Sequence, residues 1–249
     1  MDNKLHLSRP GRRRLNRDAA LLAVAFTVGA VTLSPAAGLT PDTGQLPALR
    51  EAPLKQYRAF RRMHARNDKF NQEAWIDAWT EMDGAAFKYE ITSERGSDYI
   101  RNKVLKAILT REQDVVIRGE STRAEISAEN YLFEEPEAQD PEFRYVLLKA
   151  KRKDMLLVNG RMVLNPDGTE LLRVEGTLAK NPSFWTSTVN IVREFAMVDG
   201  VRVPVSTATV AKLKFAGHAQ MDVRYAYETV NGRPVDLASI HRAAGPGGN

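Results

Sequence analysis

The chain of 249 residues contains no cysteine. Disulfides, thiolate metal sites, cysteine nucleophiles and a lipid anchor on an N-terminal cysteine are therefore excluded. Histidine is scarce as well, and no two of the four histidines have the spacing of metal ligands: His6, His64, His218 and His241. The sequence also lacks a Gly-x-Ser-x-Gly elbow and a glycine-rich phosphate loop. These absences predict a protein that is not an enzyme and that needs no cofactor or metal.

Carboxylates are frequent, but their positions do not favour catalysis. Glu175, Glu194 and Asp222 occupy the polar positions of segments in which apolar and polar residues alternate. Such positions face solvent when a sheet buries one side. We therefore interpret these three as solvated residues rather than a general acid and base, and we assign no catalytic residue.

A net charge of +5 first indicates nucleic-acid binding, but the excess is confined to one end. The first 37 residues hold six basic and two acidic side chains, which leaves a net charge of +1 for the remainder. A nearly neutral domain lacks the electrostatic footprint that nucleic acid requires. The sequence therefore predicts no nucleic-acid partner.

The first 37 residues have the layout of a secretory signal peptide. A basic run through Arg17 precedes Ala19 to Leu33, which carry no charge, and small residues follow. An uncleaved anchor is the alternative, although fifteen residues are short of the roughly 20 that span a bilayer. Arg12-Arg13 leaves both Sec and twin-arginine export open. We expect export to the periplasm, a linker over residues 38–52, one domain over 53–234 and a flexible glycine-rich tail over 235–249.

The segment from Arg173 to Pro204 shows the period of antiparallel strands most clearly. Apolar residues recur at every second position on both sides of Asn181-Pro182, which predicts a corner there. Phe184 and Trp185 follow the corner directly. Two such aromatics are either core residues or the lip of a pocket, and general burial statistics favour the core.

Two helices and about ten strands are predicted. The first helix covers Pro53 to Arg66, with Arg58, Arg61 and Arg62 outward, and the second covers Asp98 to Glu112, with Ser97 as its cap. Strands are expected at 75–82, at 87–91 and over most of the chain after Val115. Hairpin turns are expected at Asp83-Gly84, Asn159-Gly160, Asp167-Gly168 and Asp199-Gly200.

These elements predict an α+β fold in which the sheet is wider than the two helices that pack on it. Ten strands about 4.8 Å apart make a sheet roughly 45 Å wide. Two helices, each about 10 Å across, cover less than half of that width. The rest of the apolar face must be closed by curvature or filled by a guest molecule. We therefore expect a curved, unclosed antiparallel β-barrel with an apolar hollow.

Four blocks of the sequence resemble a family of bacterial envelope proteins described as outer membrane lipoprotein-sorting-like, with the LolA/LolB-like fold. The blocks are YIRNKVLKAIL, KRKDMLLVNGRMVLNPDG, RVEGTLAKNPSFWTSTVNIVREF and GVRVPVS, at residues 99–109, 151–168, 173–195 and 200–206. The resemblance extends from about Leu54 to Tyr227. It implies a half-open barrel with helices as a lid and a cavity that accepts acyl chains, and it transfers no individual ligand-binding residue.

Candidate cavity residues come from the apolar strand positions and from the faces of the predicted helices. They are Tyr99, Leu105, Leu157, Leu164, Leu172, Val174, Trp185, Val189, Ile191 and Phe195. A one-residue slip in register would turn any strand's set outward, so the pattern leaves the inward face of each strand open.

A basic run provides the second candidate site. Its residues either contact anionic head groups or a partner protein, or keep a strand end from pairing with another chain; they are Lys149, Lys151, Arg152 and Lys153.

The sequence as a whole leaves two functions open. The first is a monomeric periplasmic protein that binds a lipid or lipoprotein acyl chain and takes part in its trafficking, with possible inner- or outer-membrane partners. The second is an envelope interaction module with a filled core and no ligand.

Overall fold

The computed structural model describes residues 49, 51–137 and 140–236. The predicted signal peptide lies outside the described residues, as do most of the predicted linker and tail. None of the helices in the described part of the chain is long and apolar enough to cross a membrane.

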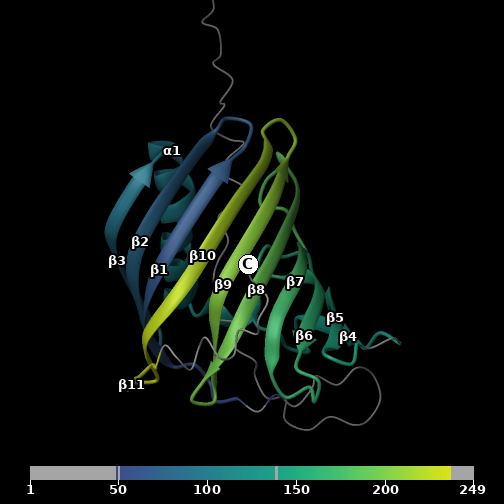
Figure 1. The fold of residues 1–249 in the computed structure, drawn as a ribbon. Helices are drawn as coiled ribbons and strands as arrows, with labels where there is room; N and C mark the ends of the chain where they lie inside the picture. Colours follow the sequence, from purple (N-terminus) through teal and green to yellow (C-terminus); the bar gives the residue numbers. More distant parts are fainter. Residues whose placement is uncertain (1–48, 50, 138–139, 237–249) are drawn as a thin grey trace, which may run out of the picture.

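In the described part of the chain, eleven antiparallel strands form a single sheet in which β11 lies off the main path, paired with β10. The order along that path is β3-β2-β1-β10-β9-β8-β7-β6-β5-β4, so β3 and β4 are its two unpaired edges (Figure 1). The predicted curved and unclosed barrel is therefore confirmed. The strands are β1 (Gln56–Asn67), β2 (Gln72–Asp83), β3 (Ala86–Gly96), β4 (Tyr131–Glu134), β5 (Arg144–Ala150), β6 (Val158–Leu164), β7 (Leu171–Leu178), β8 (Thr186–Val198), β9 (Val201–Leu213), β10 (Gly217–Val230) and β11 (Arg233–Pro234).

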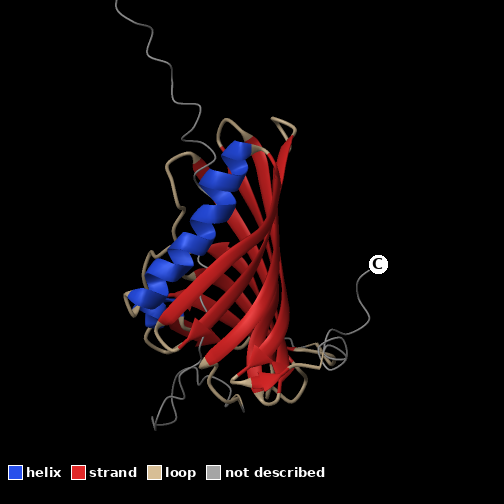
Figure 2. Ribbon diagram, turned by 90° about the vertical axis from the view of Figure 1, so that its left-hand side faces the viewer, coloured by secondary structure: helices blue, strands red, loops and turns tan. Residues whose placement is uncertain are grey.

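One long helical segment covers the concave face of the sheet (Figure 2). It consists of α1 (Asp98–Ile100), the π-helical turn η3 (Arg101–Leu105) and α2 (Lys106–Ile117), and the short 3₁₀ helix η4 (Glu120–Ala124) follows. The segment therefore continues five residues beyond the predicted end at Glu112. Ser97 makes no side-chain cap, so that prediction was wrong. Its backbone N–H instead donates to Glu73 O, which extends the pairing of β2 with β3.

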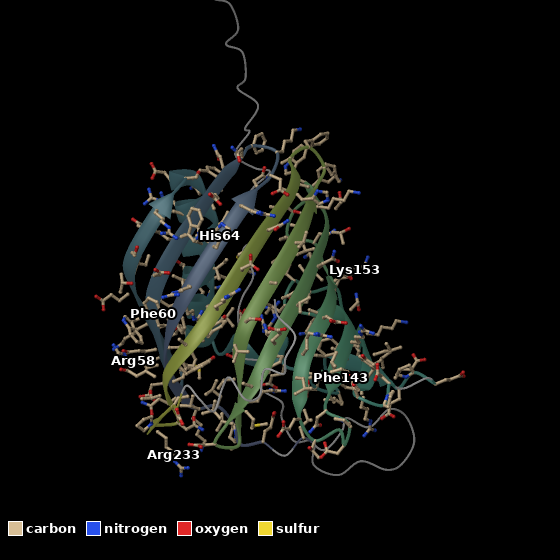
Figure 3. All side chains as sticks on the ribbon, in the orientation of Figure 1. Arg58, Phe60, His64, Phe143, Lys153 and Arg233 are labelled. Carbon is tan, nitrogen blue, oxygen red and sulfur yellow. The ribbon has the colours of Figure 1, made fainter. Side chains whose placement is uncertain are left out.

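The predicted helix over Pro53 to Arg66 is wrong, because these residues form β1. Burial alternates along β1, and Arg61 lies inward instead of outward. Phe60 lies on the outer face against Trp79, with ring centroids 5.2 Å apart, and Figure 3 labels it on β1 between Arg58 and His64. A polar residue at an inward position and an apolar residue at an outward position break the two-residue period of the strand. The remaining apolar residues then recur at three- and four-residue spacing, which is typical of a helix. Pairing with β2 and β10 on both sides overrides that local pattern.

Three predicted turns and the corner at Asn181-Pro182 are confirmed, but Asn159-Gly160 lies inside β6. Gly160 pairs directly with Gly176 of β7. A Cβ atom at Gly160 would stand 2.0 Å from the carbonyl oxygen of Glu175. The glycine is therefore required by the close approach of two strands rather than by a turn.

The core is divided into two clusters. The first lies between the helical segment and β1, β2, β9 and β10, and it includes Ile76, Leu105, Leu109, Met221 and Val223. The second lies inside β4 to β7, with Phe195 contributed by β8, and it also includes Ile126, Leu148, Leu157 and Met162. The helix therefore covers one part of the concave face, and shorter segments cover the other.

Candidate functional site

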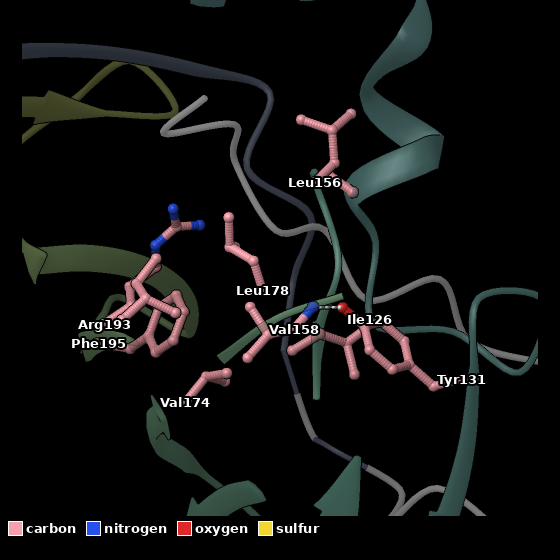
Figure 4. A pocket seen from close by; sticks show the side chains of 10 residues that line it. Ile126, Tyr131, Leu156, Val158, Val174, Leu178, Arg193 and Phe195 are labelled. Carbon is pink, nitrogen blue, oxygen red and sulfur yellow. Dashed lines mark hydrogen bonds between the residues drawn. The ribbon is translucent and has the colours of Figure 1, made fainter. Parts of the chain in front are cut away.

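A small cavity lies between the two core clusters (Figure 4). Its volume is about 40 Å³. Its walls come from the end of η4, the loops that follow η4 and β5, and strands β4, β6, β7 and β8. The lining residues are Ala124, Ile126, Tyr131, Leu156, Val158, Val174, Leu178, Ile191, Arg193 and Phe195.

The two-residue period of β8 builds one wall of this cavity. Ile191, Arg193 and Phe195 are all buried, whereas of the two residues between them Val192 is half-buried and Glu194 is exposed. Val174 and Leu178 line the cavity from the neighbouring strand β7. Residues two apart on one strand share a face of the sheet, so the inward register of β8 places its arginine among apolar side chains.

Arg193 is the one charged residue in the lining, and it is 7% exposed. Its burial lowers the pKa of the guanidinium, while Tyr225 and the carboxylate of Glu112 act in the opposite direction. Burying a charge costs free energy, which structures offset by charge pairing or hydrogen bonding. Arg193 therefore gives a mostly apolar cavity a single positively charged position.

Tyr131 closes the cavity on the side of edge strand β4. Its hydroxyl oxygen accepts a hydrogen bond from the Val158 N–H at 3.1 Å. Burial raises the pKa of this phenol above its usual range. Tyr131 therefore stays neutral at neutral pH and provides a fixed polar atom between β4 and β6.

A buried ion pair fastens the helix to the sheet beside the cavity. Arg61 of β1 holds Glu112 of α2 through Nη1–Oε2 at 2.5 Å and Nη2–Oε1 at 2.9 Å. The hydroxyl of Tyr57 accepts a further bond from Arg61 Nη2 at 2.6 Å. Burial disfavours the charge, yet the Glu112 carboxylate raises the pKa of Arg61 well above its usual value. Sequence reasoning missed this pair because β1 had been interpreted as a helix.

A second ion pair lies where the chain before β1 meets the β8–β9 turn. The side chains of Glu51 and Arg202 are joined at 3.0 Å and are almost fully buried. Burial raises the pKa of Glu51, although Arg202 opposes the shift, and burial lowers the pKa of Arg202 to about 10. The Ala52 N–H donates to Gly200 O at 2.7 Å. The chain just before β1 is thus fixed against the β8–β9 turn.

The structure brings three of the ten cavity candidates together in the lining, namely Val174, Ile191 and Phe195. The other seven lie elsewhere. Leu105 and Val189 belong to the first core cluster, Tyr99 packs against it, and Leu157 and Leu164 belong to the second. Leu172 is half-buried, and Trp185 is half-buried in the β7–β8 turn.

Seven lining residues were not among the sequence candidates. Most of them lie in short segments without a period, so only Arg193 and Leu178 carried a signal, through their alternation with outward residues. These seven are Ala124, Ile126, Tyr131, Leu156, Val158, Leu178 and Arg193.

The basic run begins at Lys149 within β5 and continues into the loop that follows this strand. Lys149 and Lys153 are exposed, and Figure 3 labels Lys153 at the surface. Lys151 Nζ donates to Ala128 O at 2.5 Å, and Arg152 donates to Asn130 Oδ1 at 2.5 Å. Two members of the run therefore hold the loop that precedes β4.

The described residues contain no group of three or more histidine or acidic side chains that could hold a metal ion. That the protein needs no metal stays a prediction. The carboxylates considered for catalysis have other contacts: Glu175 pairs with Arg161 and Arg173, and Glu194 accepts from Ser206 Oγ at 2.7 Å.

No known family model and no curated protein matches the sequence. Among solved structures, a LolA superfamily protein from Nitrosomonas europaea is similar, with 8% sequence identity and a TM-score of 0.34. The match covers 77% of this chain and 92% of that one.

Proposed function

We propose that this protein binds the apolar tail of a lipid or lipoprotein in the cavity between its two core clusters, as a non-enzymatic component of the cell envelope. The observation that carries the proposal is the division of the core. A gap lined by apolar side chains separates the cluster under the helix from the cluster inside β4 to β7. Burial of an alkyl chain there would contribute about 0.8 kcal/mol per methylene.

The cavity must widen to accept a long chain. A cavity needs about 10–15 Å³ to hold one water, so about 40 Å³ has room for only a few water-sized groups. The segment from Glu120 to Tyr131 covers the cavity with one 3₁₀ turn and irregular backbone. We propose that this segment moves outward while the helix stays attached to β1 through the Arg61–Glu112 pair.

Arg193 would determine the orientation of the ligand. It is the charged position in the lining, and a guanidinium forms strong bonds with carboxylate or phosphate groups. We propose that the anionic end of the ligand lies near Arg193 and that its tail extends between Val174, Leu178 and Ile191.

Mass spectrometry of lipid extracts from natively purified protein tests this function. We expect a stoichiometric acyl species from the wild type and its loss from Val174→Phe, which fills the cavity. Val210→Phe makes the same change at a residue that is 40% exposed on β9 and should keep the lipid. A wild-type extract without lipid, or equal loss from both variants that remain folded, would contradict the proposal.

A second candidate function is an interaction module that binds no small ligand. The small volume of the cavity favours it, and Lys149 and Lys153 would supply exposed charges for an acidic partner. Extracts free of lipid, together with retention of a partner that depends on Lys149 and Lys153, would support this alternative. Export to the periplasm is proposed for both functions from the N-terminal sequence alone.

A further inference from the structure

Three exposed phenylalanines gather at one end of the sheet. Phe70, Phe184 and Phe215 are 44%, 75% and 64% exposed. They lie in the β1–β2, β7–β8 and β9–β10 turns, and Figure 1 shows the first and last of these turns together at the upper end of the molecule. With the half-buried Trp185 they form what we call the aromatic tip. The prediction that Phe184 belongs to the core was therefore wrong.

Three rings of the aromatic tip, those of Phe184, Trp185 and Phe215, form a chain of contacts. Trp185 lies edge-on to Phe184 on one side and to Phe215 on the other, with centroids 5.4 Å and 5.5 Å apart. The ammonium of Lys214 lies 3.7 Å from the centre of the Phe184 ring. These contacts link two turns into one exposed apolar surface.

Hydrogen bonds hold the three turns in place beneath the rings. The Lys214 N–H donates to Trp185 O at 2.8 Å, and Lys69 Nζ donates to Phe215 O at 2.6 Å. Asn67 Nδ2 donates to Ala216 O at 3.1 Å. The backbone of the turns is therefore tied together, while the phenyl rings remain outside.

The charge around the tip is mostly of one sign. Four exposed lysines occupy these turns and the adjoining strand ends: Lys69, Lys180, Lys212 and Lys214. The same region holds two exposed acidic residues: Asp68, which pairs with Arg66 at 3.4 Å, and Glu73, which lies 3.3 Å from His64 Nε2. Exposed aromatic rings with a basic rim match an interface whose interior is apolar and whose surface is anionic.

We infer that the aromatic tip docks on an anionic lipid bilayer, with Phe184 and Phe215 inserted among the head groups and the four lysines above them. A bilayer fits better than a protein partner because the rings project from three turns at the end of the sheet, whereas protein interfaces bury their aromatic anchors in pockets. This inference goes beyond lipid binding in the cavity, since it concerns a different surface.

Fluorescence of Trp185 tests the docking. The full chain with Trp75→Phe and Trp79→Phe retains Trp185 as its reporter. We mix it with vesicles of phosphatidylcholine, with or without phosphatidylglycerol, that carry bromine on the acyl chains. We expect quenching and a blue shift on the anionic vesicles, because the tryptophan approaches the acyl region. Unchanged emission would overturn the inference.

Two variants locate the contact in that background. Phe184→Ser with Phe215→Ser should lower partitioning to anionic vesicles by about tenfold or more. Ile117→Ser with Leu132→Ser removes two exposed apolar side chains from other surfaces and should leave partitioning unchanged. Equal loss in both pairs would overturn the inference, as would quenching that appears only when a second protein is added.

A charge-reversal variant tests the contribution of the lysines to membrane binding. Lys180→Glu with Lys212→Glu should weaken binding to anionic vesicles by more than about thirtyfold and leave the weak binding to phosphatidylcholine unchanged. An equal effect on both lipids would overturn the role of charge. Val174→Phe should dock normally, so a failure of the tip and a failure of the cavity are distinguished.

Discussion

The buried charges at Arg61 and Glu112 are the residues on which the attachment of the helix depends. Their side chains are 1% and 3% exposed. The guanidinium also lies 4.8 Å from the Tyr225 ring centre and 5.4 Å from that of Phe87. A buried ion pair contributes little net stability over apolar residues of the same shape, but losing one member leaves a charge without compensation.

We predict that Glu112→Gln destabilises the fold by about 3–5 kcal/mol. The double variant Arg61→Met, Glu112→Leu should cost clearly less than that single change, because no charge remains buried. Urea unfolding of the wild type, Arg61→Met, Glu112→Leu and the double variant measures the coupling. If the losses in unfolding free energy of the two single variants add up to the loss of the double variant, the two charges are not coupled.

Asp154 provides a prediction on pH. Burial acts to raise its pKa, but the Leu156 N–H at 3.1 Å and Arg123 at 2.9 Å more than offset that effect and lower the pKa below its usual 3.8. A lowered pKa stabilises the fold above the unfolded value of about 3.9, and this contribution is lost as pH falls through the folded value.

Asp154→Asn should therefore reduce stability near neutral pH and flatten the acid branch of the stability profile. Urea midpoints between about pH 6 and pH 2 measure this dependence. Asp222→Asn, at an exposed position of β10, is the matched control and should keep the wild-type profile. Parallel profiles for Asp154→Asn and the wild type would refute the assignment.

At the scale of elements, the pairing of β6 with β7 depends on two glycines. Gly160 and Gly176 oppose each other, and a Cβ atom at Gly176 would stand 2.3 Å from Asn159 O. Since backbone atoms cannot yield as a flexible side chain would, either side chain would push the strands apart.

Gly160→Ala should thus destabilise the protein by about 1–3 kcal/mol, the usual cost of overpacking. Thr177→Ala, a half-buried neighbour on β7, should change stability by less than about 0.5 kcal/mol. Thermal unfolding of both variants compares them. A Gly160→Ala variant as stable as the wild type would mean that β6 and β7 separate without cost.

The elements that sequence could predict are those whose burial follows a simple period. Burial alternates along most of β10 and along β8 from Val189 to Phe195, and both strands were predicted. Strand β1 failed because Arg61, at an inward position, has its partner Glu112 on a helix 51 residues away. The cavity was predicted only where its walls are strands, since the positions of Ile126 and Leu156 depend on contacts that no local pattern encodes.

At the scale of the whole molecule, an unclosed sheet leaves two edges open to pairing with other chains. Strand β4 is four residues long, and β3 carries exposed charges at Lys88, Glu90 and Arg95. Short edge strands and charged edge residues both discourage association between sheets. We therefore predict a monomer.

Light scattering of the purified chain tests this expectation. Lys88→Val with Glu90→Val should promote association, because it removes two charges from the exposed face of an edge strand. Lys212→Val with Asp222→Val makes a comparable change on paired interior strands and should remain monomeric. A wild-type dimer, or a monomeric edge variant, would contradict the prediction.

The pairing of β1 with β10 has a consequence for how the chain matures. Next to this pairing, the Lys55 N–H donates to Oδ1 of Asn231, which lies 176 positions later in the sequence. During synthesis, the hairpins formed by the first three strands must wait for the last long strand before they can join the sheet. Such non-local closure makes folding slow, so a chain stalled before residue 217 would present both flanks of an incomplete sheet to chaperones and proteases.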